Sequence, residues 1–569
     1  MKKHLRIGIV GGGPAALLLL KNLINTGRED LAVDIFERKS ILGAGMPYSR
    51  DGSCDEHVSN VSGNELPPLP VGLEDWFGTL PSDTLARFSL NKEQFTAYKV
   101  VPRRLLGAYL CDQFNVLLSE AKTRGLPVGV HLHAAVTDIE DCPEKDAVQA
   151  RLADGRHFEF DHIAICTGHD FPEHCEGRIS GWFDSPYPPE KLKFRTPHPV
   201  AIRGASLTAI DAMRTLARQN GQFTTHTNGK ARYTCDEESN GFELVLHSRN
   251  GLLPAVRFHL EDRRPQQDKL LSKETVAANK AANGGFLSLD MVFETAFKEP
   301  FKEKDPGFYA FIADMRLEDF VAAMMKHREN KDPFELLQGE YREAEESIKH
   351  KKSVYWKEML ADLSFTLNYP AKYFSAEDMQ RLQQVLMPLI TIVIASVPQS
   401  SVEEMLALHQ AGFLKLVEVD PDSHVEPGPQ GGADYYINDQ AAPVHYETFV
   451  DCIGQPAIPF GQFPFQTLRE KRTVTQARLQ FQDPEIGRRQ LSEGVAGISA
   501  DQDGNYFLDV PGVAIDDSFA VVDAYGARNE RIFLMAVPYM GGYNPDYSGL
   551  DFCDTAGNTI ARAITGISE

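Results

Sequence analysis

The sequence has no long hydrophobic run and no excess of positive charge. After the N-terminal region, the longest apolar stretch is residues 385–397, which is too short to span a bilayer and contains Pro388. Against 80 acidic residues the chain has 58 lysines and arginines, which gives a formal net charge of −22. Nucleic acids and anionic membranes bind clustered cations, so we expect neither as a main partner. A small-molecule substrate is expected instead.

The sequence also lacks closely spaced cysteines. Eight cysteines are scattered over 569 residues, and no two of them form a CxxC pair. This spacing predicts reduced thiols and not a disulfide framework or a zinc site. It also argues against flavoenzymes that reduce their substrates through a dithiol, because these need two cysteines beside the flavin.

The N-terminus lacks the cleavage site of an export signal. Lys2 and Lys3 precede an apolar stretch, but three glycines interrupt that stretch and an acidic strand follows it. We therefore expect a cytoplasmic protein. A hydrophobic content of 42% and a charged content of 24% are ordinary for a globular protein, and the length predicts two or three domains.

A dinucleotide-binding pattern occupies residues 5–39. Residues 5–10 form an apolar, β-branched run that predicts a buried strand, and a glycine-rich turn follows it. Residues 17–25 then predict a helix, and residues 31–36 predict a second strand that ends in an acid. This order is typical of a dinucleotide-binding unit. The alternative is a plain βαβ turn.

Each residue type in this turn suits a bound dinucleotide. Gly11 makes the tight turn, Gly13 lets the backbone approach a pyrophosphate, and Ala16 lets the helix sit close to the strand. The free N–H groups at the helix N-terminus attract phosphates, and the acid after the second strand accepts ribose hydroxyls. The predicted contacts are Gly11, Gly13, Pro14, Ala15, Ala16, Glu37 and Arg38.

A long loop and a helix come next. Residues 41–70 are rich in glycine and proline and predict an ordered loop without regular structure. A helix is predicted from residue 103 to about residue 124, with Arg103 and Arg104 in its first turn. Positive charge is unfavourable there unless an anion faces it, so a phosphate contact and a solvated pair are the two alternatives.

Residues 130–138 predict a strand on which His131 and His133 share one face. That spacing suits a metal, but no third ligand is near and no metal is expected. A hairpin about residues 154–155 then leads to a buried strand that starts at residue 162 and ends at Thr167 and Gly168.

The chain resembles the bacterial FAD–NAD(P)-binding family of large two-dinucleotide flavoproteins, which is related to the flavin-dependent N-hydroxylating monooxygenases of ornithine and lysine. Five segments carry the resemblance: residues 11–16, 43–48, 57–61, 102–104 and 164–169. The resemblance implies an α/β fold with two Rossmann-like dinucleotide-binding domains, for FAD and for NAD(P), and a helical insertion. It also implies that Asn60 approaches the flavin ring, and the predicted FAD contacts further include Arg104, Val136, Thr167 and Gly168.

A second dinucleotide site is expected after residue 199. Residues 199–203 predict a strand, Gly204 begins a turn into a helix, and a strand over 242–247 ends in Ser248 and Arg249. A hydroxyl and a cation in the place of an acid suit a 2′-phosphate, which favours NADPH over NADH.

The same turn departs from the family pattern, because Ser206 stands where the family has glycine, and its side chain puts close approach of a pyrophosphate in doubt. The alternative is a structural helix-capping turn with a surface arginine. The predicted contacts are Gly204, Ser206, Leu207, Thr208, Ser248, Arg249 and Gly454.

We predict five consecutive parts of the chain. They are an FAD-binding domain over residues 1–198, the first part of an NAD(P)-binding domain over 199–259, a helical insertion over 260–412, the return of the NAD(P)-binding domain over 413–450, and the C-terminal part of the FAD-binding domain over 451–569. By resemblance, the closing helix at 552–564 points its N-terminus at the flavin. Its predicted contacts are Gly549, Leu550 and Asp551. Tyr543, Asp546 and Tyr547 reach the flavin or a substrate, or else pack the loop.

These patterns predict an FAD-dependent oxidoreductase reduced by NADPH. By resemblance it is a monooxygenase that hydroxylates a small molecule, such as an amine, through a flavin hydroperoxide. One alternative is an NAD(P)H-dependent reductase or oxidase that passes electrons to another acceptor. The other is a non-catalytic flavin or nucleotide sensor, which Ser206 favours. The sequence identifies no catalytic residue, substrate or oligomeric state.

Overall fold

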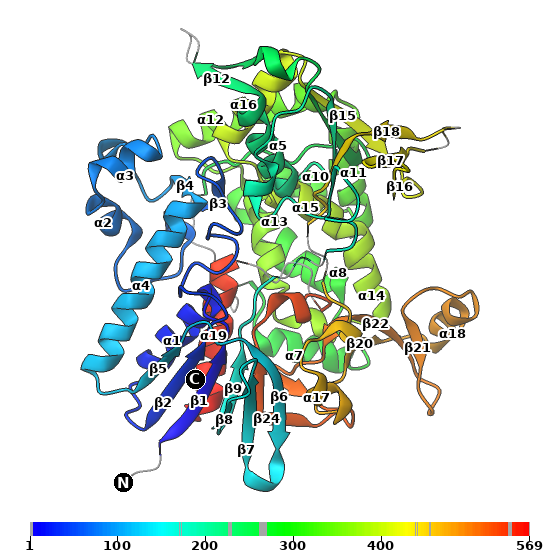
Figure 1. Ribbon diagram of the computed structural model, residues 1–569. Coiled ribbons are helices and arrows are strands. Elements are labelled where there is room, and N and C mark those ends of the chain that lie inside the picture. Colours follow the sequence, from blue (N-terminus) through cyan, green and yellow to red (C-terminus); the bar gives the residue numbers. More distant parts are fainter. Residues whose placement is uncertain are drawn as a thin grey trace.

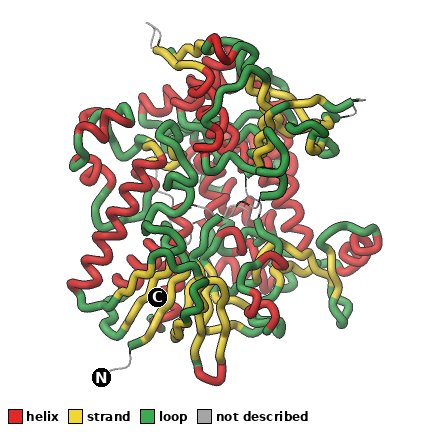
Figure 2. The backbone as a smooth tube through the Cα atoms, in the orientation of Figure 1, coloured by secondary structure: helices red, strands yellow, loops and turns green. Residues whose placement is uncertain are grey.

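The computed structural model describes residues 4–567 except 170, 172, 226–229, 261–269, 439, 441, 455–456 and 544–548. Two parallel sheets form the framework, the first in the lower half of Figure 1 and the second, marked by β15, in the upper half. Helices fill the region between and beside them, as the red segments of Figure 2 show. No helix in the described part of the chain has the length and apolar character needed to cross a membrane.

The first sheet has the strand order β23-β24-β9-β1-β2-β5, and every neighbouring pair is parallel except β23 and β24. Its central strands are continuous apolar runs, as expected where both faces of a parallel sheet are covered. The strands are β1 (Leu5–Val10), β2 (Leu31–Phe36), β5 (Val128–His131), β9 (His162–Ile165), β23 (Ala520–Val522) and β24 (Arg528–Leu534). The predicted strands at 5–10 and 31–36 are confirmed.

Two helices from opposite ends of the sequence pack together against this sheet. They are α1 (Pro14–Asn25) and α19 (Gly549–Thr565). A Cβ on Gly557 would lie 3.2 Å from the backbone of Leu19, so glycine allows the close approach. Lys21 Nζ, which lies 2.5 Å from Asp554 Oδ1, ties the two helices together. The last helix therefore has a fixed direction relative to the first nucleotide turn.

The prediction of one strand over residues 130–138 is wrong. β5 ends at His131, His133 adopts a left-handed φ of 52°, and β6 (Val136–Cys142) starts a separate antiparallel sheet with β7 (Ala147–Leu152) and β8 (His157–Phe160). His131 stacks on Phe36 at 4.7 Å and His133 lies outside the strand, so the two histidines share no strand face.

The prediction of an irregular loop over residues 41–70 is wrong in part. β3 (Val58–Ser62) pairs with β4 (Val100–Pro102). β4 ends directly before α4 (Arg103–Thr123) begins. No proline lies within β3, since Pro47 precedes it and Pro67, Pro68 and Pro70 follow it, so they do not prevent this short pairing. The predicted helix that starts at residue 103 is confirmed.

The second sheet has the order β10-β19-β11-β14-β15 and is parallel throughout. Its hydrophobic core is separate from that of the first sheet. The strands are β10 (Trp182–Phe183), β11 (Pro199–Arg203), β14 (Glu243–Arg249), β15 (Leu414–Val419) and β19 (Thr448–Asp451), and α5 (Leu207–Asn220) and α16 (Gln399–Gln410) pack against it.

Helices occupy the described residues between β14 and α16. They are α7 (Lys273–Ala282), α8 (Leu289–Val292), α9 (Phe301–Lys304), α10 (Pro306–Ile312), α11 (Leu317–Glu329), α12 (Pro333–His350), α13 (Tyr355–Thr366), α14 (Ala376–Arg381) and α15 (Met387–Ile394). The predicted boundaries of the five parts stay predictions.

Smaller elements complete the fold. They are the helices α2 (Leu73–Gly78), α3 (Ser82–Arg87), α17 (Gln466–Glu470) and α18 (Pro484–Ser492), the pair β12 (Gly221–Thr225) and β13 (Ala231–Cys235), the sheet β16 (His424–Pro427), β17 (Ala433–Tyr436) and β18 (Val444–Tyr446), and the sheet β20 (Gln476–Gln480), β21 (Ile498–Ala500) and β22 (Tyr506–Val513).

The two parallel sheets repeat one backbone pattern. Gly11 N donates to Phe36 O at 2.8 Å, and Gly204 N donates to His247 O at 2.8 Å. On the other side, Cys166 N donates to Val10 O and Cys452 N donates to Arg203 O, both at 2.8 Å. These bonds make Gly204 the equivalent of Gly11, His247 that of Phe36, and Cys452 that of Cys166.

His247 makes the second sheet sensitive to acid. The side chain is 2% exposed and stacks on Tyr435 at 4.1 Å, and burial lowers its pKa to about 4. An unfolded histidine titrates at about 6.5, so the unfolded chain binds the proton first as pH falls. The stabilisation is complete above about pH 6.5 and is lost towards pH 4, by about 3 kcal/mol.

We expect His247→Phe, which introduces the residue type of Phe36, to remove most of this loss. The measurement is urea unfolding of both proteins at about pH 7 and about pH 4.5. His424 is the control, because it also stacks on a tyrosine, Tyr436 at 4.6 Å, but is exposed. Equal acid sensitivity of the wild type, His247→Phe and His424→Phe would contradict the assignment.

Candidate functional site

The first glycine turn has room for no side chain at Gly11. Its φ is +106°, and a Cβ there would lie 2.6 Å from Cys166 O. The next residue fixes the acid at the end of β2, since Gly12 N donates to Glu37 Oε2 at 2.8 Å. Lys39 N donates to Glu37 Oε1 at 2.8 Å. Each carboxylate oxygen keeps a lone pair with which to accept a ribose hydroxyl.

The N-terminus of α1 is open to a phosphate. Gly13 caps the helix, and a Cβ built on it would meet only Gly45, with its nearest atom at 3.4 Å. Pro14 stands at the first helical position, where it has no N–H to leave unpaired. Ala15 is half-buried and Ala16 is fully buried against the sheet. The roles that the motif predicts for these residues stay predictions.

The end of β9 completes a cradle for a dinucleotide. Thr167 Oγ1 is buried and has no hydrogen-bond partner within the described residues. A buried hydroxyl without a partner is costly, so a ligand atom there would satisfy it. Gly168 has no atom within 4 Å of the place where a Cβ would stand. The residues of this crevice therefore fit FAD.

Tyr48 packs against α4, where Gly107 leaves no room for a Cβ beside the tyrosine carbonyl. Burial raises the pKa of this tyrosine, and the charges of Arg103 and Asp551 act on it from the first turns of α4 and α19. Gly549 begins α19 with a φ of +88°, and Leu550 is buried. The closing helix thus starts at Gly549, three residues before its predicted start.

The other predicted FAD contacts lie around this crevice. Arg104 Nη1 donates to Asp55 Oδ1 at 2.8 Å, so a carboxylate faces this cation. Asn60 lies in β3, where its carbonyl accepts from Arg257. Val136 begins β6, two residues after Ala134, whose N–H donates to Glu37 O at 2.9 Å. Arg38 is exposed beside Glu37.

The second glycine turn repeats the first with a serine in it. Gly204 has a φ of +113°, and a Cβ would lie 2.8 Å from Cys452 O. We call the first sheet with its glycine turn and α1 the first unit, and the second sheet with its glycine turn and α5 the second unit. By the shared hydrogen bonds, Ser206 stands where the first unit has Gly13. Ser206 precedes α5 but its side chain does not cap the helix, and its hydroxyl makes no hydrogen bond within the described residues. Leu207 and Thr208 form the open first turn, and Thr208 lies next to Gly454.

The acid of the first unit has no counterpart in the second. Ser248 and Arg249 take the places of Glu37 and Arg38, because His247 is the equivalent of Phe36. Ser248 Oγ donates to Leu252 O at 2.8 Å, which folds the loop after β14 back on itself. Arg249 is exposed, and no carboxylate of the described chain pairs with it.

Two buried cysteines, Cys166 and Cys553, belong to the hydrophobic core of the first sheet. The proximity of Cys553 adds to the effect of burial in raising the pKa of Cys166. Burial likewise raises the pKa of Cys553 to about 12. The sequence suggested no neighbouring cysteines, but both thiols stay protonated and buried, which makes them poor nucleophiles.

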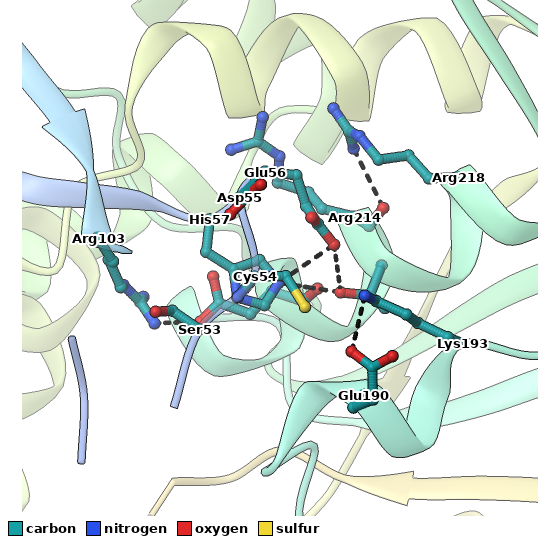
Figure 3. A network of polar contacts seen from close by, with 12 residues as sticks. Ser53, Cys54, Asp55, Glu56, His57, Arg103, Glu190, Lys193, Arg214 and Arg218 are labelled. Atoms are coloured by element: carbon teal, nitrogen blue, oxygen red, sulfur yellow. Dashed lines mark hydrogen bonds and ion pairs between the residues drawn. The ribbon is translucent and has the colours of Figure 1, made fainter. Parts of the chain in front are cut away.

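A polar network joins the two units, as Figure 3 shows around the turn formed by residues 53–57. His57 is fully buried, and its Nδ1 accepts from Cys54 N at 3.1 Å. Its Nε2 therefore carries the proton and lies 3.0 Å from Thr215 Oγ1 on α5. Burial lowers the pKa of His57 and keeps it neutral. Thr215 in turn donates to Glu56 Oε1 at 2.8 Å.

A cavity of about 1240 Å³ opens beside this network. Its walls come from β3, α5, α12, α16 and the segment around Arg257. Arg257 crosses to the first unit and pairs with Glu65. Sequence reasoning missed this cavity, and the one signal for it was the run of polar residues at 54–57. Its lining includes Asp55, Glu56, Val58, Tyr98, Arg218 and Tyr341.

Comparison with known proteins identifies part of the chain. Residues 8–170 match a family described as FAD-NAD(P)-binding. The N-terminal part is an FAD-NAD(P)-binding domain. Residues 272–394 match a family described as the YdhS-like middle domain. The predicted α/β fold for FAD and NAD(P) is therefore confirmed.

A relative and several solved structures extend over nearly the whole chain. The uncharacterized protein YdhS of Escherichia coli (strain K12) is 25% identical over 565 residues, which cover 98% of this chain and 97% of YdhS. The ornithine N-hydroxylase KtzI of Kutzneria sp. 744 is 15% identical, with a TM-score of 0.43 and coverage of 99% of both chains.

The bacillithiol disulfide reductase Bdr (YpdA) of Staphylococcus aureus is 11% identical, with a TM-score of 0.43 and coverage of 100% of this chain and 99% of that one.

The predicted contacts before the last helix are only partly described. Asp546 and Tyr547 lie outside the described residues. Tyr543 is buried, and burial raises its pKa to about 12. Its contact with the flavin or a substrate stays a prediction.

Gly13→Ala tests the FAD crevice of the FAD-NAD(P)-binding domain. The new Cβ meets only Gly45, at ordinary contact distance, so we expect the fold to persist. It occupies the space where a pyrophosphate would approach, so FAD affinity should fall by about tenfold or more. The measurement is the flavin content and FAD titration of the purified protein. Gly78→Ala, in α2 with no atom within 4 Å of the new Cβ and no left-handed φ, is the control. Full flavin content in Gly13→Ala would contradict the site.

Proposed function

We propose that this chain is an FAD-dependent oxidoreductase that takes its electrons from NADPH. The observation that carries the proposal is the repeated backbone pattern, with Glu37 in one unit and Ser248 and Arg249 at the equivalent positions of the other. An acid suits the free ribose of an FAD adenosine, and a cation with a hydroxyl suits a 2′-phosphate. The two units thus differ where FAD and NADPH differ.

The chain's own residues would hold the cofactors in the following way. Gly11, Gly13 and the N-terminus of α1 would receive the FAD pyrophosphate, and Glu37 would receive its ribose. The N-terminus of α19 would place a positive dipole end next to the flavin, where it stabilises negative charge. When bound, FAD supplies two-electron chemistry by accepting a hydride and passing the electrons on.

Ser206 is compatible with a working second site. Its hydroxyl makes no hydrogen bond within the described residues and stands at the helix N-terminus where a pyrophosphate would lie. A serine there can donate a hydrogen bond to a phosphate oxygen. This hydrogen bond compensates for the loss of the closer backbone approach that glycine would allow. This supports an enzyme over a non-catalytic sensor.

The large cavity is the place we propose for the substrate. It borders β3, the strand that carries Asn60, the residue that the family resemblance brings close to the flavin ring. Its size suits a small molecule, and polar and apolar side chains line it together. We propose that one oxygen atom of O₂ enters this substrate while the other leaves as water, with NADPH supplying the two electrons.

A reductase or oxidase that passes the electrons to another acceptor is the second candidate. Transfer through a protein dithiol is not favoured, because Cys166 and Cys553 are buried and protonated. We propose a cytoplasmic location for either enzyme.

Product analysis separates the two candidates. The FAD-loaded protein is mixed with NADPH, oxygen and a panel of primary amines, and NADPH consumed, hydrogen peroxide released and hydroxylated product are quantified together. A monooxygenase gives product in step with NADPH consumption for at least one substrate. Peroxide equal to the NADPH consumed, with every amine, would contradict oxygen insertion and support an oxidase.

The choice of nicotinamide cofactor is tested at Arg249 and Ser248. Arg249→Ala should raise the KM for NADPH about tenfold or more and leave the KM for NADH within about twofold, because only NADPH has the 2′-phosphate. Ser248→Glu, which copies Glu37, should shift the preference towards NADH. Arg232→Ala, an exposed arginine on β13, is the control. Equal effects of Arg249→Ala on both cofactors would remove the 2′-phosphate argument.

A further inference from the structure

A buried carboxylate on α5 connects the two dinucleotide-binding units. Asp211 lies in the second turn of this helix and is 4% exposed. Its Oδ2 accepts from Arg103 Nη1 at 2.5 Å and from the Tyr187 hydroxyl at 2.9 Å. Arg103 is the first residue of α4, so the ion pair runs directly from the second unit to the first.

The backbone of Asp211 is bound to the first unit as well. Its carbonyl oxygen lies 3.2 Å from the protonated Nε2 of His57, in the turn that Figure 3 shows between Arg103 on one side and Arg214 and Arg218 on the other. Burial raises the pKa of Tyr187, so its hydroxyl stays protonated and able to donate. Asp211 is thus held by three groups from outside its own helix.

The two ends of this connection lie at the two cofactor sites. Helix α4 begins at Arg103 and packs against the backbone of Tyr48 at Gly107, and Gly45 of the same loop lies next to Gly13 in the first glycine turn. Ser206, which precedes α5, and Leu207, its first residue, lie at the second glycine turn. Hydride transfer needs the reacting atoms within about 3.5 Å, and a displacement of about 1 Å costs about 100-fold in rate. A buried ion pair with directed hydrogen bonds is suited to hold such a distance, because its geometry is fixed.

We propose that Asp211 is a positioning residue, which through Arg103, and with Tyr187 holding the same carboxylate in place, fixes the nucleotide-binding helix α5 against the FAD-binding unit at the spacing that hydride transfer requires. This rests on the proposed function, since it assumes FAD on the first unit and NADPH on the second. Asp211 touches neither reacting atom, and it acts only through the placement of α5.

Two variants and one matched control test the proposal. Asp211→Asn removes the charge and keeps the shape, and Tyr187→Phe removes one hydrogen bond from the same carboxylate. Glu404→Gln is the control, because Glu404 is also a buried carboxylate that binds α5. It accepts from Arg214 at 2.9 Å and from Arg218 at 2.6 Å, but it lies on α16 and makes no hydrogen bond or ion pair to the first unit within the described residues.

The first measurement is anaerobic stopped-flow reduction of the FAD-loaded proteins over a range of NADPH concentrations. We expect the limiting rate to fall about 10- to 100-fold in Asp211→Asn, about 3- to 10-fold in Tyr187→Phe, and less than about twofold in Glu404→Gln. The NADPH concentration for half-maximal rate should change less than about threefold in all three, because the nucleotide contacts are intact.

The second measurement is hydrogen–deuterium exchange of the proteins without nicotinamide cofactor. We expect the amides of residues 53–57 and 103–107 to exchange about tenfold faster in Asp211→Asn, and to be unchanged in Glu404→Gln. Limiting reduction rates equal to the wild type in both Asp211→Asn and Tyr187→Phe would overturn the positioning role, whatever hydrogen–deuterium exchange shows. A loss of reduction rate in Glu404→Gln equal to that in Asp211→Asn would overturn it as well. A wild-type protein that holds FAD but is reduced by neither NADPH nor NADH would overturn the proposed function itself, and this inference with it.

Discussion

The close approach of a glycine to the carbonyl at the end of a neighbouring strand organises both halves of this molecule. At Gly11 the partner is Cys166 O and at Gly204 it is Cys452 O, and neither position has room for a Cβ. The tight turn that results directs the N-terminus of the following helix to the carboxyl ends of the strands. Since those ends are where dinucleotides bind in open parallel sheets, one steric constraint, used twice, creates two sites in a single chain.

The relation between the two sites is set by contacts of another kind. Helix α5 of the second unit meets the first unit through a small number of buried polar groups, with Asp211 and His57 at their centre. Such groups are costly to bury unless every one is paired, and here each charge has a partner of opposite sign or a hydrogen bond. The arrangement of the units is therefore specific, where an apolar interface would tolerate sliding.

Local patterns predicted much of the framework. The strands at 5–10 and 31–36, the glycine turns and the helices that follow them are contiguous in sequence, and their periodicity and turn residues are sufficient to locate them. The equivalence of Ser206 with Gly13, inferred from the motif, agrees with the backbone hydrogen bonds. The strand β3 was missed because its pairing partner β4 lies on the far side of the proline-rich segment, and no local signal announces such a pairing.

The contacts between units could not be predicted in this way. Arg103 and Asp211 are 108 residues apart in sequence, and each stands in an ordinary helical pattern that is equally compatible with a solvated surface. The sequence indicated either a phosphate or solvent as the partner of Arg103 and Arg104. In the structure each of these arginines pairs with a carboxylate of the chain itself. The large cavity could not be predicted either, because six segments that are distant in sequence form its walls.

The most direct measurement of the central claim is a crystal structure of the protein with FAD and NADP⁺ bound. The account predicts FAD along the first glycine turn with its ribose on Glu37, NADP⁺ along the second with its 2′-phosphate at Ser248 and Arg249, and the nicotinamide C4 within about 3.5 Å of the flavin N5. A nicotinamide dinucleotide bound elsewhere, or a second glycine turn that stays empty at saturating NADP⁺, would contradict it.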